Sequence, residues 1–389
     1  MKVLDIVKEW SIRCAQCGTC AAFYPLYVPS CPPGHKFRFI GYFPMGRLMI
    51  GRGLSEGLLT LEDDDVLERL YTCTACRACQ VNCGNIVSNH IVDVIEGTRQ
   101  MAVAAGCMMP AHEIMLESLK KNDNVLEKPR EDRGSWAKGL NLKNVAAEKA
   151  DVVYRAGCLL SYEPEVQPAA HDAIYLLQRA GVDVGIEGNE EVCCGGRAYE
   201  VGLLSEFKKY AQHNIEAYNK AGVRKAIVSC SDGLSHMKLL YPKINIKMNF
   251  EVLHIVEFLD QLVKDGKIKF TKKLPMKVTY HDPCHLGRHA GIYDPPRDIL
   301  RNIPGLELIE MERSREFSWC CGAGGGVKQA FPEFSLWTAV ERIREAKETG
   351  AEALVSSCPW CERNFKEAVK ESGDEIEVYD IAEIARKAI

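Results

Sequence analysis

The stretch VTYHDPC, residues 278–284, belongs to a pattern that occurs twice in the second half of the chain. In the later copy it is followed by CCGAGGG and ALVSSC, and in the earlier copy VVYRAGC is followed by CCGG and AIVSC. The matching cysteines are Cys158 with Cys284, Cys193-Cys194 with Cys320-Cys321, and Cys230 with Cys358. Their offsets of 126, 127 and 128 residues indicate a duplicated domain rather than a solenoid.

Each copy has the texture of an α/β domain, because short β-branched or aromatic runs such as VVYR and ALVS alternate with amphipathic segments. A helical face followed by a capping glycine is predicted in both copies. Its residues are Ala170, Ile174, Leu177 and Gly181 in the first copy, and Leu336, Val340, Ile343 and Gly350 in the second. We therefore expect mostly parallel sheets with the cysteines at the carboxyl ends of the strands, where α/β folds bind ligands.

Eighteen cysteines among 389 residues call for an explanation. Disulfide-rich proteins are usually small and secreted, and the adjacent pairs Cys193-Cys194 and Cys320-Cys321 do not suit disulfide geometry. Thiolates that bind metal in a reducing compartment fit the blocks of cysteines better. Cys107 lies outside these blocks, and we expect it to be a small buried apolar residue.

The run Cys73-x2-Cys76-x2-Cys79-x3-Cys83 has the ligand spacing of bacterial ferredoxins with two [4Fe–4S] clusters. Zinc sites usually use two short CxxC knuckles instead. An earlier block keeps Cys14-x2-Cys17-x2-Cys20, but Tyr24-Pro25 stands where the fourth cysteine and its proline are expected, and Cys31-Pro32 follows seven residues later.

We interpret Cys31 as the displaced fourth ligand. Cluster one would then be bound by Cys14, Cys17, Cys20 and Cys83. Cluster two would be bound by Cys73, Cys76, Cys79 and Cys31. The alternative is that Cys31 is free and that cluster two has a non-cysteine or open position.

These patterns predict four parts. Residues 1–105 form an α+β ferredoxin-like 2[4Fe–4S] domain with an insert at 33–67, which packs over the clusters or forms a docking face. Residues 106–150 are a helical and linker segment whose polar stretch 120–140 wraps the surface, and could cap the ferredoxin part or dock it against the rest. The first repeat occupies 151–272 and the second 273–389.

The order of a cysteine, a Cys-Cys-Gly and a Cys-x2-Cys resembles the CCG domain of the B and D subunits of heterodisulfide reductase. A ferredoxin block followed by two CCG copies is the D-subunit arrangement. Related iron–sulfur subunits act in glycolate and lactate oxidation, in sulfite-reduction membrane complexes and in tungsten-dependent benzoyl-CoA reductase complexes. The stretch from CTACRACQ at 73–80 to SWAKGL at 135–140 is most similar to the last group.

The resemblance implies a noncubane [4Fe–4S] cluster in a complete CCG motif. In the second copy its five ligands are Cys284, Cys320, Cys321, Cys358 and Cys361. The first copy has Cys158, Cys193, Cys194 and Cys230, with Gly233 in the fifth position. It could hold an ordinary or altered cluster, zinc, or no metal. The disulfide chemistry of the family uses two complete sites, so the incomplete copy counts against that activity here.

Glycines and histidines accompany these cysteines. We expect the backbone at Gly322, Gly324 and Gly325 to approach the cluster and direct N–H groups at sulfur. His281, His285 and His289 surround Cys284, and they either pack and donate hydrogen bonds or, for His285, supply a proton.

No flavin, nicotinamide, haem or quinone motif is present, so electrons are expected to enter and leave through flavin- or iron–sulfur-containing partner subunits. The net charge of −4 and the absence of a basic block exclude nucleic acid as a partner. With no signal peptide and no apolar run of membrane-spanning length, we expect a cytoplasmic protein without direct membrane insertion, in a low-oxygen setting.

The predicted function is an electron-transfer subunit of an oxidoreductase complex. The alternatives are a disulfide or thiol reductase that acts at the noncubane cluster, and the iron–sulfur subunit of a hydroxy-acid oxidase.

Overall fold

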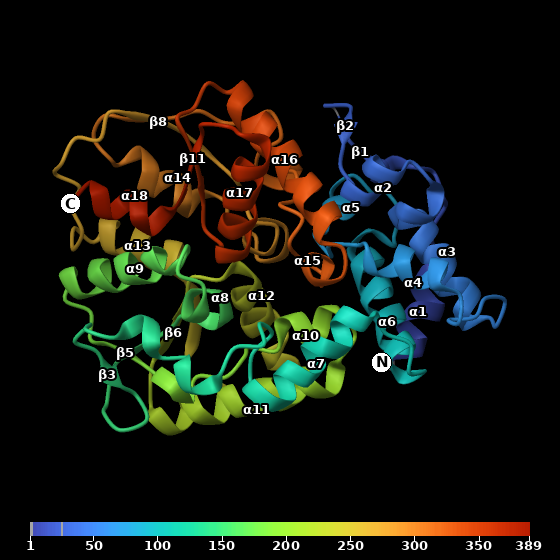
Figure 1. Ribbon diagram of the computed structural model, residues 1–389, viewed down its shortest axis with the longest axis horizontal. Helices are drawn as coiled ribbons and strands as arrows, with labels where there is room; N and C mark the ends of the chain where they lie inside the picture. Colours follow the sequence, from blue (N-terminus) through green and yellow to red (C-terminus); the bar gives the residue numbers. More distant parts are fainter. Residues whose placement is uncertain (1–2, 25) are drawn as a thin grey trace.

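Two parallel β-sheets with the same strand order form the second half of the computed structural model, which describes residues 3–24 and 26–389 (Figure 1). The first sheet has the order β3-β5-β4-β6-β7, and the second has the order β11-β10-β8-β9. Written from its other edge, the second is β9-β8-β10-β11, which corresponds strand by strand to β5-β4-β6-β7. The strands of the first are β3 (Lys143–Asn144), β4 (Val152–Arg155), β5 (Val184–Ile186), β6 (Lys225–Val228) and β7 (Glu251–His254). Those of the second are β8 (Met276–Tyr280), β9 (Leu306–Leu308), β10 (Ala353–Ser356) and β11 (Glu377–Asp380). The predicted duplication of an α/β domain is confirmed, and β3 is an extra edge strand from the preceding segment.

The helices also correspond one to one. The first copy has α8 (Gly157–Tyr162), α9 (Gln167–Arg179), α10 (Gly196–Glu200), α11 (Leu204–Ala221), α12 (Ser231–Leu239) and α13 (Ile255–Lys264). The second copy has a helical turn η8 (His285–His289), then α14 (Asp294–Arg301), α15 (Val327–Ala330), α16 (Pro332–Glu348), α17 (Pro359–Ser372) and α18 (Ile381–Lys387).

One sequence-based pairing of helices is wrong. Both expected helices exist and both end at a glycine with positive φ, at Gly181 and Gly350. However, α9 lies between β4 and β5, whereas α16 lies between β9 and β10, so the true counterpart of α9 is α14. The apolar pattern could not separate these helices because each copy has several with similar spacing. Of the predicted α16 face, Ile343 is buried and Leu336 and Val340 are only half-buried.

Strand register brings the cysteines of each copy to one edge of its sheet. In the first copy Arg155 of β4 pairs with Val228 of β6, so the segments leading to Cys158 and Cys230 leave the sheet together. In the second copy Tyr280 pairs with Val355 in the same way ahead of Cys284 and Cys358. Parallel strands therefore place the thiols at the carboxyl edge, as expected.

The two copies are related by a pseudo-two-fold axis. Helix α9 packs on α18 and α13 packs on α14, which are contacts that exchange when the copies are exchanged. The contacts of α12 with η8 and of α17 with α8 are related in the same way. Figure 1 shows the second copy above the first, with these helices between them.

The last helix of each copy begins with the same device. His254 accepts the Val256 N–H at the start of α13, and the Glu257 side chain accepts the N–H of His254. Asp380 and its partner Glu383 repeat these two bonds at the start of α18. Such capping boxes satisfy backbone groups that the helix leaves unpaired.

The N-terminal part is mainly helical, with one short antiparallel pair, β1 (Ala22–Phe23) and β2 (Val28–Pro29). Its helices are α1 (Val3–Ser11), α2 (Pro32–Phe37), α3 (Pro44–Ser55), α4 (Asp64–Tyr71), α5 (Ala78–Val81) and α6 (Ile91–Ala104). The insert at 33–67 supplies most of α2, all of α3 and the start of α4, and α1, α3 and α6 pack together. Figure 1 shows this part beside both repeats.

The segment expected to wrap the surface is partly interior. Helix α7 (Pro110–Asn122) packs against α15, and the Nε2 of His112 lies 3.0 Å from the Gly326 carbonyl oxygen. Further on, Arg133 and Trp136 are buried. Its polar stretch 120–140 packs on the first repeat, where Arg133 forms a buried ion pair with Glu191, and its expected role of capping or docking the ferredoxin part stays a prediction. Within the described part of the chain, no helix has the length and apolar character needed to span a bilayer.

Candidate metal centres

Four thiols from two distant segments line one small cavity in the N-terminal part. They are Cys14, Cys17, Cys20 and Cys83, the set predicted for cluster one. Pro44, Met45 and Leu48 of α3 close the apolar side of this cavity. The insert therefore packs over this centre. Cys17 is the exposed member of the set, and Cys20 is buried.

A second cavity of about 330 Å³ is lined by Cys31, Cys73, Cys76 and Cys79, the set predicted for cluster two. Cys31 reaches it because Pro32 and Pro33 start α2 directly after the thiol. Pro44 and Arg47 of α3 line the same cavity. Tyr24, at the usual ligand position, is 44 % exposed, and Pro25 lies outside the described residues. The placement favours Cys31 as the fourth ligand, an assignment that stays a prediction.

The loops that carry these thiols hold a strained backbone. Gln16, Ala75 and Arg77 have positive φ angles of 54°, 53° and 61°, which are unfavourable for residues with a side chain. Such strain persists where the surroundings fix the loop, and it is concentrated at ligand sites. Burial raises the pKa of the Cys20 and Cys31 thiols to about 12. These thiols therefore ionise only when a cationic centre such as iron replaces their protons, so both sets fit a metal cluster.

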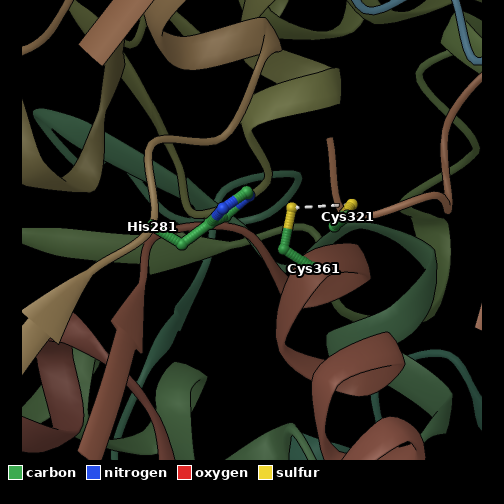
Figure 2. A group of neighbouring side chains, drawn as sticks. All are labelled: His281, Cys321 and Cys361. Atoms are coloured by element: carbon green, nitrogen blue, oxygen red, sulfur yellow. Dashed lines mark hydrogen bonds between the residues drawn. The ribbon is translucent and has the colours of Figure 1, made fainter. Parts of the chain in front are cut away.

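The five cysteines of the complete CCG motif form one buried group. Their fractional exposures are 8 % or less. The sulfurs of Cys361 and Cys321 are 3.1 Å apart (Figure 2), and the Gly322 N–H donates to the Cys320 sulfur at 3.4 Å. Cys284 and Cys320 pack together with Cys76 of the second ferredoxin set. The chemistry of five converging thiols fits an iron–sulfur cluster.

His281 lies against this group, as Figure 2 shows. One of its ring nitrogens is within 4.8 Å of the Cys321 and Cys361 sulfurs. Arg342 Nε donates to His281 Nδ1 at 3.2 Å, which leaves the proton of the neutral ring on Nε2. Burial lowers the pKa of His281 well below its usual value, so the ring stays neutral. His281 is therefore set to donate a hydrogen bond from Nε2, which is buried and has no hydrogen-bond partner in the described structure.

The two other histidines take different positions. His285 Nδ1 lies 3.4 Å from the Cys284 sulfur, and its Nε2 lies 3.0 Å from a Glu200 oxygen. His289 stacks on His285 with ring centroids 4.0 Å apart and contacts the carbonyl of Ala75 at 2.9 Å. His285 thus touches a predicted ligand, whereas His289 connects the second copy to the ferredoxin part.

The glycine run has a second role that its sequence did not indicate. Gly322 directs its N–H at sulfur, as expected, but the N–H of Gly325 donates to Glu200 Oε2 at 3.1 Å instead of to a sulfur. A Cβ on Gly325 would lie 2.3 Å from the Cys73 carbonyl oxygen, and one on Gly324 would lie 2.7 Å from that of Thr74. These glycines allow the loop of the second copy to approach the ferredoxin backbone closely.

The incomplete motif of the first copy surrounds a cavity of about 450 Å³. Its four thiols, those of Cys158, Cys193, Cys194 and Cys230, all line that cavity. Backbone N–H groups of Gly195, Gly196 and Gly233 donate to three of them, at 3.3–3.5 Å. A Cβ added at Gly233 would lie 3.9 Å from the Cys194 sulfur, so the position of the missing fifth thiol faces the same space.

Three buried guanidinium groups surround this first-copy centre. Arg155 and Arg197 line the cavity, and Arg133 donates to the Cys158 sulfur at 3.6 Å. Hydrogen bonding to Cys193 and the charge of Arg133 lower the pKa of Cys158 to about 5, against the effect of burial. Hydrogen bonding to Cys193 likewise lowers the pKa of Cys194 to about 7. Positive charge around thiolates fits an anionic cluster.

The four groups of thiols follow one another through the molecule. Cys20 of the first ferredoxin set interacts electrostatically with Cys31 of the second. Cys76 of the second set contacts Cys320 of the second CCG copy. Cys358 of that copy contacts Cys230 of the first, on the pseudo-two-fold axis. The order in space is therefore ferredoxin set one, ferredoxin set two, second CCG copy, first CCG copy.

Sequence reasoning missed the charged residues around these centres. The three arginines of the first-copy centre come from separate segments, and nothing local marks them as neighbours. Glu200, Asp232 and His236 form with His285 a buried group whose ligand atoms lie within 4.8 Å of one another. Asp232 stands in SCSDGL beside the missing cysteine, which is the one signal that could have singled it out.

Comparisons with known proteins agree with the geometry. The cysteine-rich CCG domain matches residues 152–238 and 278–366, and a 4Fe–4S dicluster domain matches 10–87. The chain is 33% identical to the D subunit of dihydromethanophenazine:CoB–CoM heterodisulfide reductase of Methanosarcina acetivorans, over 97% of this chain and 93% of that protein. It is 33% identical to EtfAB:quinone oxidoreductase of Syntrophomonas wolfei, over 83% of this chain and 47% of that protein.

A solved structure shares the fold. It is a hypothetical protein from Helicobacter pylori, with a TM-score of 0.62 and 12% identity, and the match covers 99% of this chain and 71% of that chain.

Proposed function

The chain belongs to the family of CCG-domain iron–sulfur oxidoreductases that includes the D subunit of heterodisulfide reductase, and from this premise we propose that it carries electrons between partner subunits. The route comprises two cubane [4Fe–4S] clusters, a noncubane [4Fe–4S] cluster in the second CCG copy and a further cluster in the first. Membership of the family makes the chain an iron–sulfur electron-transfer protein. The number of clusters, their types and their order are the proposal.

The observation that carries the proposal is the contact between thiol groups at both boundaries of the second CCG copy. Cys76 meets Cys320 at the boundary between the ferredoxin part and the second copy. Cys230 meets Cys358 at the boundary between the two copies. Ligands that touch bring the centres they hold close together, and one-electron transfer is the chemistry that such clusters supply when bound. A chain of this kind suits transport rather than isolated structural sites.

Each part of the chain has a role in this proposal. Cys14, Cys17, Cys20 and Cys83 hold cluster one, and Cys31, Cys73, Cys76 and Cys79 hold cluster two. Cys284, Cys320, Cys321, Cys358 and Cys361 hold the noncubane cluster. His281 donates a hydrogen bond toward that cluster from Nε2, and Arg342 fixes the ring in the required tautomer. The glycine N–H groups stabilise the negative charge on sulfur.

We propose that the first copy holds a [4Fe–4S] cluster through Cys158, Cys193, Cys194 and Cys230. Four thiols are sufficient for a cubane cluster. The convergence of the four thiols on one pocket, the backbone N–H groups aimed at sulfur and the three guanidinium groups support this choice over a relic without metal.

Electrons enter or leave at the ferredoxin end. Most of the large apolar side chains that stay exposed in the described residues precede residue 90. They include Ile12, Tyr27, Phe39, Ile40, Leu58 and Ile86. The concentration of these side chains in one part of the molecule supports an interaction surface there, and the exposed Cys17 lies in the same part. The partner there is a flavin- or iron–sulfur-containing subunit, as the relatives named after multi-subunit redox enzymes suggest.

A second candidate function is reduction of a disulfide at the second CCG centre. It is favoured by relatives that are themselves named as subunits of heterodisulfide reductase and that match over 93% of their length. His285 lies 3.4 Å from the Cys284 sulfur and would carry the proton that a released thiolate needs. Steady-state turnover of a mixed disulfide with a reduced viologen dye, lost in Cys361→Ser, would support this function over simple transfer.

Iron counting and spectroscopy test the main proposal. Protein purified without oxygen should hold about 16 iron atoms if all four centres are loaded, and about 12 without the first copy, counting four per cluster. A reproducible value of about eight would remove both CCG centres from the route. Stepwise reduction followed by electron paramagnetic resonance should resolve interacting signals, since neighbouring paramagnetic clusters broaden one another's spectra.

A further inference from the structure

We propose that Glu200, Asp232 and His285 form a binding site for one divalent transition-metal ion between the two CCG copies, separate from the cysteine centres. Glu200 lies at the end of α10 and Asp232 lies in α12, both in the first copy. His285 lies in η8 of the second copy. The site therefore exists only where the copies meet.

Three buried ligand atoms point into the same space. Glu200, Asp232 and His285 are 0 %, 7 % and 4 % exposed. Glu200 Oε1, Asp232 Oδ1 and His285 Nε2 have no hydrogen-bond partner in the described structure. His285 Nε2 and Glu200 Oε1 are only 3.0 Å apart, yet they do not meet hydrogen-bond geometry. Buried polar atoms without partners are costly, and a shared cation would satisfy all three.

The spacing suits a metal. Two ligands bound at about 2.0–2.2 Å are separated by about 3.0–3.6 Å in octahedral to tetrahedral geometry. His285 Nε2 lies 3.0 Å from Glu200 Oε1 and 3.6 Å from Asp232 Oδ1. His236 Nδ1 lies 3.3 Å from Asp232 Oδ1 but also 2.7 Å from the Asp232 carbonyl oxygen. His236 therefore stands at the edge of the site with its Nδ1–H donated to that carbonyl, and water would complete the coordination.

The second oxygen of each carboxylate, Glu200 Oε2 and Asp232 Oδ2, contacts the guanidinium of Arg197. Arg197 donates to Glu200 Oε2 at 2.5 Å and lies 3.2 Å from Asp232 Oδ2. Each carboxylate thus offers one oxygen to Arg197 and turns the other toward the site, which is the outer support that metal ligands usually have.

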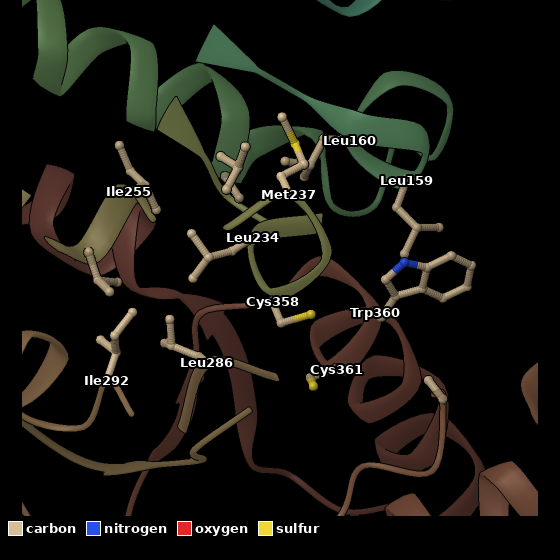
Figure 3. Packing of buried hydrophobic residues seen from close by; sticks show 14 of the residues in the cluster. Leu159, Leu160, Leu234, Met237, Ile255, Leu286, Ile292, Cys358, Trp360 and Cys361 are labelled. Atoms are coloured by element: carbon tan, nitrogen blue, oxygen red, sulfur yellow. The ribbon is translucent and has the colours of Figure 1, made fainter. Parts of the chain in front are cut away.

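The pseudo-two-fold axis supplies an internal comparison. The offset of 128 residues between Cys230 and Cys358 aligns Asp232 with Trp360. The offset of 126 residues between Cys158 and Cys284 aligns His285 with Leu159. Figure 3 shows Trp360 beside Leu159, and both are buried. The same interface is therefore closed by apolar packing on one side of the axis and by charged and imidazole groups on the other. Packing alone does not require Asp232 and His285 to be polar, because the equivalent positions on the other side of the axis are apolar.

The ion has a route from solvent. A pocket lined by Asp93, Glu96 and Ser235 reaches His236, which lies at the edge of the site. Imidazole with carboxylate ligands suits Mn²⁺, Fe²⁺ and Zn²⁺ rather than the thiophilic ions that cysteine selects. Mn²⁺ is the best probe, because oxidised [4Fe–4S] clusters are silent in electron paramagnetic resonance and bound Mn²⁺ is not.

The experiment titrates the cluster-loaded full-length protein with Mn²⁺ without oxygen, after gel filtration to remove loosely bound metal. The wild type should bind one Mn²⁺ per chain, displaced by Zn²⁺, with a nitrogen coupling in pulsed spectra that reports the His285 imidazole. Glu200→Gln and Asp232→Asn should each weaken binding by about 100-fold. Asp260→Asn is the control, because Asp260 is a buried carboxylate outside the site with one unpartnered oxygen.

Iron content and elution volume of each variant show whether it has folded. Because the nitrogen coupling is measured on the wild type, the test stands even if a variant does not fold. The proposal is overturned if the wild type binds neither Mn²⁺ nor Zn²⁺ beyond its cluster iron, or if Glu200→Gln and Asp232→Asn bind Mn²⁺ as the wild type does.

Discussion

The two CCG copies have one fold and two different centres. In the second copy five thiols converge, with Cys321 and Cys361 in contact and His281 beside them. In the first copy four thiols surround a cavity, and arginines take the place of the histidine. The sheets, the helices and the caps are matched, so the difference lies in side chains at the carboxyl edge. This teaches that the fold fixes where a centre sits, while a few residues decide which centre it is.

The largest expected effect comes from removing one thiol in each copy. Cys361→Ser should disrupt the second-copy cluster and slow electron flow by about 100-fold or more, because that copy lies between the ferredoxin sets and the first copy. Cys230→Ser should disturb the first-copy cluster alone. Transient reduction of each cluster, followed optically and by paramagnetic resonance, measures both. If electrons stopped at cluster two in Cys230→Ser but passed beyond it as in the wild type in Cys361→Ser, the proposed order of the two CCG centres would be reversed.

Restoring the fifth thiol sharpens the comparison from the other side. Gly233→Cys should convert the first-copy spectrum toward that of the second, because a Cβ there has no neighbour closer than 3.6 Å and faces the Cys194 sulfur at 3.9 Å. Gly233→Ser is the matched control, with the same shape and no thiol. An unchanged spectrum in Gly233→Cys with full iron content would show that the missing ligand does not set the cluster type.

The arginine that is particular to the first copy provides a third test. Arg133 and Glu191 form a buried pair 2.7 Å apart beside Cys158. Arg133→Gln should lower the free energy of unfolding by about 3–5 kcal/mol, because it leaves Glu191 buried without its partner. The double change Arg133→Gln with Glu191→Gln should recover much of that stability. It should still lower the reduction potential of the first-copy cluster, because the guanidinium that donates to the Cys158 sulfur is lost. A potential equal to that of the wild type would exclude this role.

The smallest expected effect is on the pH dependence of stability, through the two matched helix caps His254 and Asp380. Their pKa values are shifted in opposite directions. Burial lowers the pKa of His254 to about 4 and raises that of Asp380 to about 8. His254 therefore adds stability above its unfolded pKa of about 6.5 and loses it as the pH falls toward 4. Asp380 adds stability below its unfolded pKa of about 3.9 and loses it as the pH rises toward 8.

The same substitution at both positions separates these contributions. His254→Asn should flatten the fall of the thermal midpoint between pH 6.5 and 5, and Asp380→Asn should flatten its decline between pH 5 and 8. Thermal unfolding of the cluster-loaded protein without oxygen measures both. Parallel pH profiles for the two variants would contradict the opposite titrations.

Much of this architecture could be read from the sequence, because repeated motifs carry fold and ligand together. The thiol sets of the ferredoxin part followed from their spacing, and those of the two CCG motifs followed from the internal repeat together with the family resemblance. The structure places each set around one site. Helix equivalence failed at α16, since apolar spacing does not distinguish helices of one domain. Arg133, Glu200 and Asp232 could not be foreseen as neighbours, because long-range packing alone brings them to the centres.

The contact between Cys230 and Cys358 lies on the pseudo-two-fold axis, so equivalent positions meet each other there. That is the geometry of a symmetric dimer, in which one surface patch is complementary to itself. Two separate copies of a single CCG domain could form this interface only with identical residues on both sides. Fusion into one chain removes that constraint. It permits Trp360 and Leu159 to close one side of the interface while Asp232 and His285 occupy the other. A homodimer cannot place different residues on its two sides in this way.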